Sequence, residues 1–312
     1  MKRAACWLSL VLAGLWLWPS SARAQACSYS INGPLNFGTI TGVPTPQIDV
    51  TATVNVQCGA LYIGTVRTCL GIPGANESGG ARLMTLSTGE SVRFQLYRDA
   101  ARTQVLGAYG ETSAPLTIDV PVLIYGSATA TLYGRVFANQ DDKPVGNYSK
   151  TLSPIYAREQ AGTGTPCESV GGTPYSVSPV TATLRIDPMC TVAADPLNFG
   201  SFSSLSADRD ASTNLRLDCT LKAPYQISLN GGGTGNVANR RMSQAGNPAT
   251  VSYQLYSDTA RSRVWGNTSA NWVAGTGTGT SQVYTVYGRV PAQSMPSTTG
   301  TFEDTVTVTV SY

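Results

Sequence analysis

Residues 304–312 read DTVTVTVSY and predict the strongest strand of the chain. Apolar and polar side chains alternate throughout this run, as they do in a strand with one buried face. The expected buried face carries Val306, Val308, Val310 and Tyr312. Because Tyr312 is the last residue of the sequence, we expect no later strand of the same chain to lie beside this one.

The half of the chain that ends in this strand repeats the half before it. Four landmarks recur in the same order: PLNFG at 34–38 and 196–200, the QLY stretch from Val92 and from Val251, YGRV at 133–136 and 287–290, and Gly146-Asn147-Tyr148 against Gly300-Thr301-Phe302. Short alternating runs separated by turn residues fill both halves and favour a β-sandwich in each. Arg135 and Arg289 of YGRV recur as well, so we expect them to serve the shared fold.

The first residues predict export. Lys2 and Arg3 precede an apolar run from Trp7 to Trp18, and a small-x-small pattern ends at Ala24. This is typical of a secretory signal peptide, which we place at residues 1–24, although cleavage after Ala26 fits equally well. We therefore expect a protein that passes through the periplasm to the cell surface.

Cysteine usage agrees with export. Of the 7 cysteines, Cys6 belongs to the predicted signal peptide, and the even remainder predicts disulfides in an oxidising compartment. Cysteines bracket PLNFG in each half, which predicts the pairs Cys27–Cys58 and Cys190–Cys219. Cys69 and Cys167 have no counterparts in the second half, so we expect them to form an extra bridge within the first.

Composition argues against several functions. The sequence has 0 histidines, which excludes catalytic triads and metal sites that depend on imidazole. Its net charge is +3 with only 12% charged residues, so no nucleic-acid surface is indicated. We expect no cofactor, no metal and no catalytic activity.

The two halves end differently. The first continues beyond its last shared landmark into a further alternating run, in which Val180, Ala182, Leu184 and Ile186 are the apolar members. We expect residues 177–186 to complete the first sandwich, which gives an N-terminal domain at 25–187 and a C-terminal domain at 188–312. The second domain lacks such a strand, so its edge at Val306–Tyr312 is expected to accept a strand from another chain.

This asymmetry predicts a position in a fibre. The strand ahead of Cys190 is expected to be used internally, and almost nothing precedes Cys27 after the predicted cleavage. A subunit that accepts a strand and has none to give is expected at the tip of a strand-exchanged fibre.

The landmarks together resemble the spore coat U family, the pilin-type domain of archaic chaperone–usher pili. The resemblance covers nearly all of the chain after residue 24, twice, and rests on Cys…PLNFG…Cys, YGRV and the ending GTFEDTVTVTVSY at 300–312. The ending is degraded in the first half, at 146–152, which fits a domain freed from the chaperone-dependent cycle by its own internal strand. The resemblance implies tandem pilin-type Ig-like sandwiches, a periplasmic chaperone, an outer-membrane usher and an adjacent pilin subunit that donates a strand. It also implies a tip adhesin that supports attachment and biofilm formation.

Comparing the halves suggests where adhesion could occur. A polar Gly/Thr loop of the second half corresponds in the first to an apolar stretch that contains Leu116, Ile118, Val120, Val122, Leu123 and Ile124. If exposed, this stretch forms an adhesive patch; alternatively, Ile118, Val120 and Val122 extend a strand and pack inside. A second candidate loop carries Leu61, Tyr62 and Ile63. The rival interpretations are a secreted coat or matrix protein outside any pilus, and a β-sandwich carbohydrate-active enzyme, which the scarcity of acidic residues disfavours.

Overall fold

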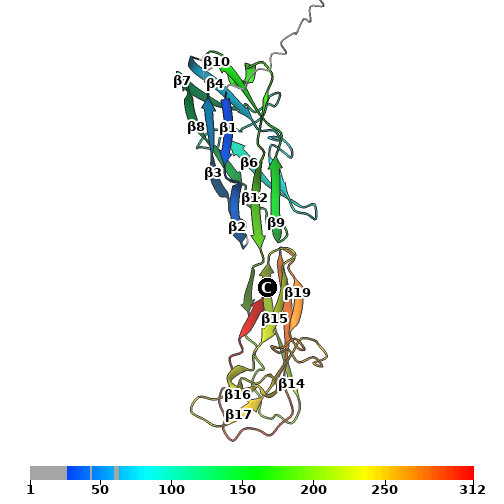
Figure 1. Cartoon of the computed structure of the whole chain (residues 1–312). Helices are drawn as coiled ribbons and strands as arrows, with labels where there is room; N and C mark the ends of the chain where they lie inside the picture. The colour runs from blue at the N-terminus through cyan, green and yellow to red at the C-terminus, as the bar shows by residue number, and fades with distance from the viewer. Residues whose placement is uncertain (1–26, 43, 60–62) are drawn as a thin grey trace, which may run out of the picture.

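The computed structural model describes residues 27–312 except residue 43 and residues 60–62. It confirms the all-β prediction, with two sandwich halves stacked end to end (Figure 1). The helical elements within the described residues are short 3-10 turns: η1 (Cys167–Ser169), η2 (Gly232–Thr234) and η3 (Val237–Asn239). No helix in this part of the chain is long and apolar enough to cross a membrane. The predicted signal peptide, Leu61 and Tyr62 lie outside the described residues.

The first half forms two facing sheets. Its strands are β1 (Cys27–Asn32), β2 (Leu35–Thr41), β3 (Ile48–Cys58), β4 (Gly64–Gly71), β5 (Arg82–Thr85), β6 (Ser91–Tyr97), β7 (Leu116–Val122), β8 (Gly126–Val136), β9 (Gly146–Leu152), β10 (Ile155–Ala161), β11 (Tyr175–Val177) and β12 (Val180–Asp187). One sheet has the order β1-β3-β8-β6-β5-β9-β12-β2 and the other β11-β10-β4-β7.

The second half repeats this plan with fewer paired strands. Its strands are β13 (Cys190–Ala194), β14 (Arg209–Cys219), β15 (Pro224–Leu229), β16 (Arg241–Ser243), β17 (Thr250–Ser252), β18 (Gln254–Tyr256), β19 (Val273–Thr276), β20 (Ser281–Val290) and β21 (Val308–Ser311). The sheets have the orders β13-β14-β20-β18 and β19-β15-β21, and β16 pairs with β17 separately.

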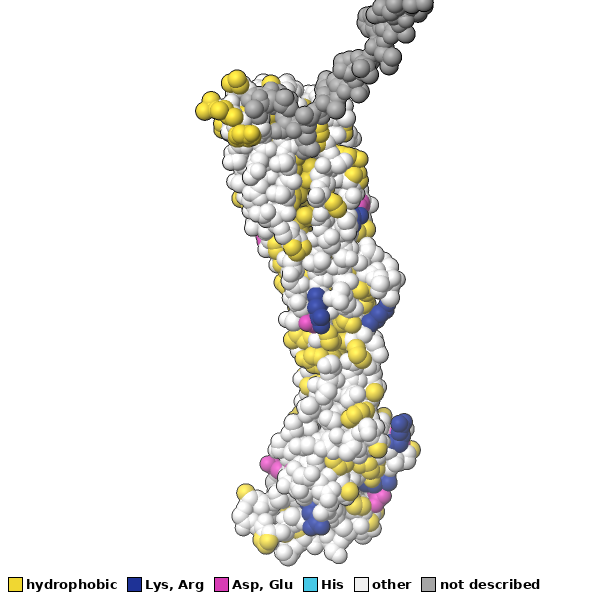
Figure 2. Space-filling model, in the orientation of Figure 1, with side chains coloured by type: hydrophobic (Ala, Val, Ile, Leu, Met, Phe, Trp, Pro, Cys, Tyr) yellow, Lys and Arg dark blue, Asp and Glu magenta, His cyan; other side chains and the backbone are white. Residues whose placement is uncertain are grey.

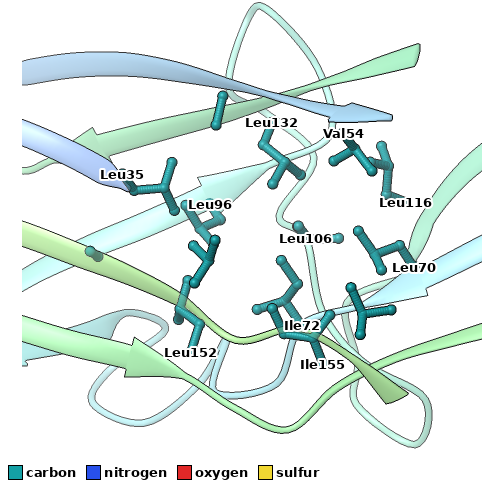
Figure 3. Close-up of a cluster of buried hydrophobic side chains, with 14 of the residues drawn as sticks. Leu35, Val54, Leu70, Ile72, Leu96, Leu106, Leu116, Leu132, Leu152 and Ile155 are labelled. Carbon is teal, nitrogen blue, oxygen red and sulfur yellow. The ribbon is translucent and has the colours of Figure 1, made fainter. Parts of the chain in front are cut away.

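Alternating apolar side chains from both sheets of the first half meet in one core. Leu35 of β2, Leu132 of β8 and Leu152 of β9 face Leu70 of β4 and Leu116 of β7 (Figure 3). Each of these side chains is buried, because the inward position recurs at every second residue of a strand. The second half has its own, separate core, which includes Leu217, Ile227 and Trp265.

Disulfides tie both halves at matching places. Cys27–Cys58 joins β1 to β3, and Cys190–Cys219 joins β13 to β14. Cys69–Cys167 joins β4 to the turn η1 and packs with Val170 in a small buried cluster. The structure thus pairs these cysteines as the sequence repeat suggests, and the third bridge fastens the long connection ahead of β11.

Candidate functional site: an open groove and an exposed apolar end

In the first half, β12 lies between two strands. It pairs antiparallel with β9, from Val180 opposite Leu152 to Ile186 opposite Gly146. On its other side it pairs parallel with β2, with Ala182 opposite Leu35. Within the described residues β2 has no other strand partner, so β12 holds β2 in the sheet.

The side chains of β12 fill the interior at this edge. The expected residues Val180, Ala182, Leu184 and Ile186 all belong to the core, with exposed fractions between 0% and 8%. The segment just before them, β11, pairs antiparallel with β10, with Val177 opposite Ile155. Residues 175–187 therefore cover the edges of both sheets of the first sandwich.

The second half has the flanking elements of this arrangement without the strand between them. Its PLNFG segment, the counterpart of β2, forms no strand, and β21 pairs only with β15 among the described strands. The segment that corresponds to β9 is extended but makes only an isolated bridge, from Glu303 to Ser243. The position that β12 fills in the first half is unfilled here.

A groove follows this unfilled position. Two adjoining hollows of about 480 Å³ and 630 Å³ lie between the PLNFG segment and the C-terminal segment. Their shared lining includes Leu197, Phe199, Met242 and Phe302. The groove is therefore long and has an apolar floor.

Comparison of equivalent side chains shows what the groove lacks. Leu152, on β9, is buried against β12, whereas its counterpart Val306 is only half-buried. Val308 and Val310 are also half-buried, and Tyr312 is 54% exposed. These four residues were expected to form the accepting edge, and the structure places Val306 and Val308 in the lining of the groove.

Two hydrogen bonds to Asp304 fix the accepting segment. The hydroxyl of Tyr253 donates to Asp304 Oδ2 at 2.7 Å, and the amide of Gly233 donates to Asp304 Oδ1 at 2.7 Å. Burial raises the pKa of the Tyr253 phenol, and its hydrogen bond to Asp304 raises that pKa further. The neutral phenol therefore remains a hydrogen-bond donor that anchors residue 304 beside the groove.

The far end of the first half carries a second feature, a group of exposed apolar side chains that we call the apolar end. Ile63, Leu123, Ile124 and Tyr125 are exposed by 88%, 80%, 66% and 81%. Gly64 pairs with Val122, which brings Ile63 next to the connection between β7 and β8. Hydrophobic side chains gather at this end of the molecule in Figure 2. Solvent-exposed residues of this size and number are typical of a contact surface.

The structure corrects part of the expected adhesive stretch. Leu116, Ile118, Val120 and Val122 are 5%, 4%, 0% and 2% exposed, so the prediction that they form an exposed patch is wrong. They alternate with polar residues along β7 and face the core, as the alternative interpretation held. Leu123 and Ile124 interrupt the alternation and lie outside the strand. Tyr125 was missed, although the same interruption includes it.

Comparisons with known proteins agree with this architecture. The model of the Spore Coat Protein U domain matches residues 19–153 and again 176–309. Protein U of Myxococcus xanthus is 36% identical over 129 residues, which span 37% of this chain and 71% of that protein. Among solved structures, the CsuC–CsuE chaperone–tip adhesion subunit pre-assembly complex from archaic chaperone–usher Csu pili of Acinetobacter baumannii contains a chain with a similar fold. That likeness has a TM-score of 0.52 at 17% identity and covers 91% of this chain and 100% of the other. The CupB6 tip adhesin of Pseudomonas aeruginosa aligns with a TM-score of 0.38 at 11% identity, over 91% and 94% of the two chains. The chain belongs to the Spore Coat Protein U domain family and contains two copies of that domain.

Proposed function

We propose that this protein is a non-catalytic subunit of a surface pilus, completed by a strand from a neighbouring subunit and placed at the tip of the fibre. The observation that carries the proposal is the contrast between two copies of one domain. β12 fills the edge of the first copy, and the equivalent edge of the second is an open apolar groove.

A donated strand is the occupant that best suits this groove. Extended backbone would pair with the free edges of residues 300–306 and of the PLNFG segment, as β12 pairs with β9 and β2. Four inward apolar side chains would contribute roughly 1.5–3 kcal/mol each before ordering costs. This sum is comparable to the stability of a whole domain.

Export and assembly follow from the same proposal. A periplasmic chaperone occupies the groove first, an outer-membrane usher passes the subunit to the surface, and an adjacent pilin then takes the place of the chaperone. The signal peptide at residues 1–24 directs the chain into this route. Support comes from the family and from the tip adhesion subunit named among the similar folds.

If the protein lies at the tip of the fibre, the apolar end forms the free extremity of that fibre. The first domain uses its own strand β12 and offers no open edge there, so the fibre extends only from the second domain. The apolar end lies at the opposite extremity of the molecule, at the connection between β7 and β8 (Figures 1 and 2). We propose that these residues attach the fibre to apolar surfaces and so support biofilm formation.

The test uses cells that display the fibre and carry an epitope tag on this protein. Gold-labelled antibody should mark the free end of each fibre, and label along the shaft would contradict tip placement. In the same cells, joint replacement of Leu123, Ile124 and Tyr125 by serine should leave labelled fibres intact. Retention on polystyrene should fall more than tenfold, because each lost apolar contact is worth roughly 1.5 kcal/mol.

Val283→Ser is the matched control, since Val283 is 59% exposed but lies on β20 of the second domain. Retention of that variant should equal the parent. Equal loss from both variants would assign attachment to general surface hydrophobicity and not to the apolar end.

A further inference from the structure

The junction between the two domains is a direct contact at the end of the first domain. The backbone amide of Val145 donates to the carbonyl of Leu221 at 3.0 Å. Lys222 forms an ion pair with Glu90. Only Pro188 and Met189 separate β12 from β13, so the completing strand leads directly into the next domain.

The loop that makes this contact has a counterpart at the far end of the second domain. Gln140 and Gln293 mark the start of the loop in the two domains. The side chain of Gln140 accepts a hydrogen bond from the backbone amide of Arg93 at 2.7 Å, and that of Gln293 accepts one from the amide of Ser252 at 3.1 Å. Its end is marked by Gly146 and Gly300, whose φ angles are 147° and 149°. Residues 294–299 therefore correspond to residues 141–145, and Thr299 takes the position of Val145.

The register of β12 shows which partner would reach this second loop. β12 ends beside Gly146, with Ile186 opposite it, and the second domain follows at that point. A strand donated to the open groove in the same register would end beside Gly300. The domain attached to that strand would then emerge next to residues 294–299.

The chemistry of the two loop regions differs in one respect. Glu90 precedes β6, and Ala249 precedes β17 at the equivalent place, so the acidic partner of Lys222 is not repeated. Met295 of the second loop is 45% exposed. The acidic residue at this place in the first domain is thus replaced by an apolar one in the second.

We propose that residues 294–299, with Ala249, form a docking surface for the domain of the neighbouring subunit that donates the strand. The contact reproduces the junction within this chain: the amide of Thr299 donates to a carbonyl of the incoming domain, as Val145 donates to Leu221. The proposal rests on the strand-accepting function and adds a second contact at the end of the groove, where Met295 and Thr299 line the 630 Å³ hollow. With this contact, the orientation of neighbouring subunits is fixed in the same way as that of the two domains within this chain.

The test compares two extended versions of the full chain. One carries a short Asn-Gly turn and a copy of residues 175–187 after Tyr312, which supplies the strand alone. The other carries the same turn followed by a copy of residues 175–312, which supplies the strand and a domain. Thermal unfolding reports whether the groove is filled, and amide hydrogen exchange by NMR reports on Thr299.

We expect both versions to raise the unfolding temperature of the second domain, and only the longer one to slow exchange at Thr299, by about tenfold or more. The amide of Val145 is the internal standard and should be protected in both. Ala249→Lys, which places a cation opposite the copied Lys222 at the position equivalent to Glu90, should remove most of the gain, whereas Val283→Lys should not.

Equal exchange at Thr299 in two stabilised versions would overturn the docking surface and leave the strand-accepting function standing. A failure of both versions to stabilise the second domain would overturn both the docking surface and the strand-accepting function.

Discussion

At the scale of single residues, two buried arginines organise the domains. Arg82 is 0% exposed, and its guanidinium donates to the carbonyls of Ile72 at 2.6 Å and Leu106 at 2.8 Å, and to the side chain of Gln95. Burial lowers the pKa of Arg82 to about 10, so it stays charged at neutral pH. Arg240 repeats this arrangement, with bonds to the carbonyls of Leu229 and Trp265 and to Gln254.

Replacement of Arg82 by methionine should destabilise the first domain selectively. It leaves several buried carbonyls without a donor, at a cost of about 3 kcal/mol or more. Beyond the predicted signal peptide, both tryptophans, Trp265 and Trp272, lie in the second domain. Circular dichroism should therefore show earlier unfolding while the fluorescence transition stays unchanged.

The matched variant, Arg240→Met, should give the opposite result, with an early fluorescence transition. If Arg82→Met instead shifted the fluorescence transition as well, the two arginines would not act within separate domains.

The YGRV arginines show how far a repeat can predict a role. Recurrence in both halves indicated a structural function, and the structure supplies the partners. Arg135 binds both carboxylate oxygens of Asp49, at 2.8 and 2.9 Å, and Arg289 binds Asp210 at 2.7 and 2.9 Å. The hydrogen bond from Arg135 lowers the pKa of Asp49. The sequence could not name Asp49 as the partner, because the pair joins neighbouring strands that are far apart along the chain.

At the scale of elements, β12 holds β9 and β2 in one sheet, because it pairs with both. The alternating pattern alone predicted the strand and its four inward residues, because one buried face leaves a period of two. The same pattern predicted a strand over 304–312, but only Val308–Ser311 is a paired strand in the structure. The difference is physical: residues before Val308 lack the neighbour that β12 provides to β9.

Introduction of a charge into β12 tests this role. Leu184 is 2% exposed, so Leu184→Asp removes an apolar contact and buries a carboxylate. The expected loss is about 3 kcal/mol or more of first-domain stability. Unfolding measured by circular dichroism should shift to lower temperature, with tryptophan fluorescence unchanged.

Arg185→Ser on the exposed face of β12 is the control and should cost little. A normal first-domain transition in Leu184→Asp would mean that the domain does not depend on this strand.

At the apolar end, the sequence alone did not distinguish buried strand residues from exposed loop residues. Comparison of the halves located the apolar stretch, but a strand interior and a loop tip have the same composition there. Alternation with polar residues assigns Leu116 to Val122 to the core, and its interruption at Leu123 marks the exposed end. The junction loops were not predicted, because their role depends on how the domains stack.

At the scale of the whole molecule, the Glu90–Lys222 ion pair contributes to the stacking of the domains. The hydrogen bond from Lys222 is the main cause that lowers the pKa of Glu90 to about 2, from its ordinary 4.5. A lowered pKa means that this contribution is complete above about pH 4.5 and is lost as the pH falls toward 2. Both side chains are partly exposed, so salt also weakens the pair.

Glu90→Gln should therefore broaden the distribution of distances between the domains at pH 6 and low salt. Fluorescence energy transfer between one dye in each domain measures this distribution. The variant and the parent should converge near pH 2 and at high salt. A difference that persists unchanged at pH 2 would show that the ion pair is not its cause.

The proposed function follows from one segment, residues 175–187 with strands β11 and β12, which completes the first domain. In the first domain, residues 175–187 cover both sheet edges; in the second, the same edges border a groove. The proposed completion of the second domain by a partner strand rests on this incomplete sandwich.

Amide hydrogen exchange along the accepting edge tests most directly whether the second domain lacks a strand. It compares residues 302–306, the counterpart of β9, in the chain alone with the same residues in the chain extended by a turn and a copy of residues 175–187. We expect fast exchange in the chain alone and exchange about a hundredfold slower or more once the strand is supplied, matching β9 of the first domain. Protection already equal to that of β9 in the chain alone would show that the second domain is complete without a partner.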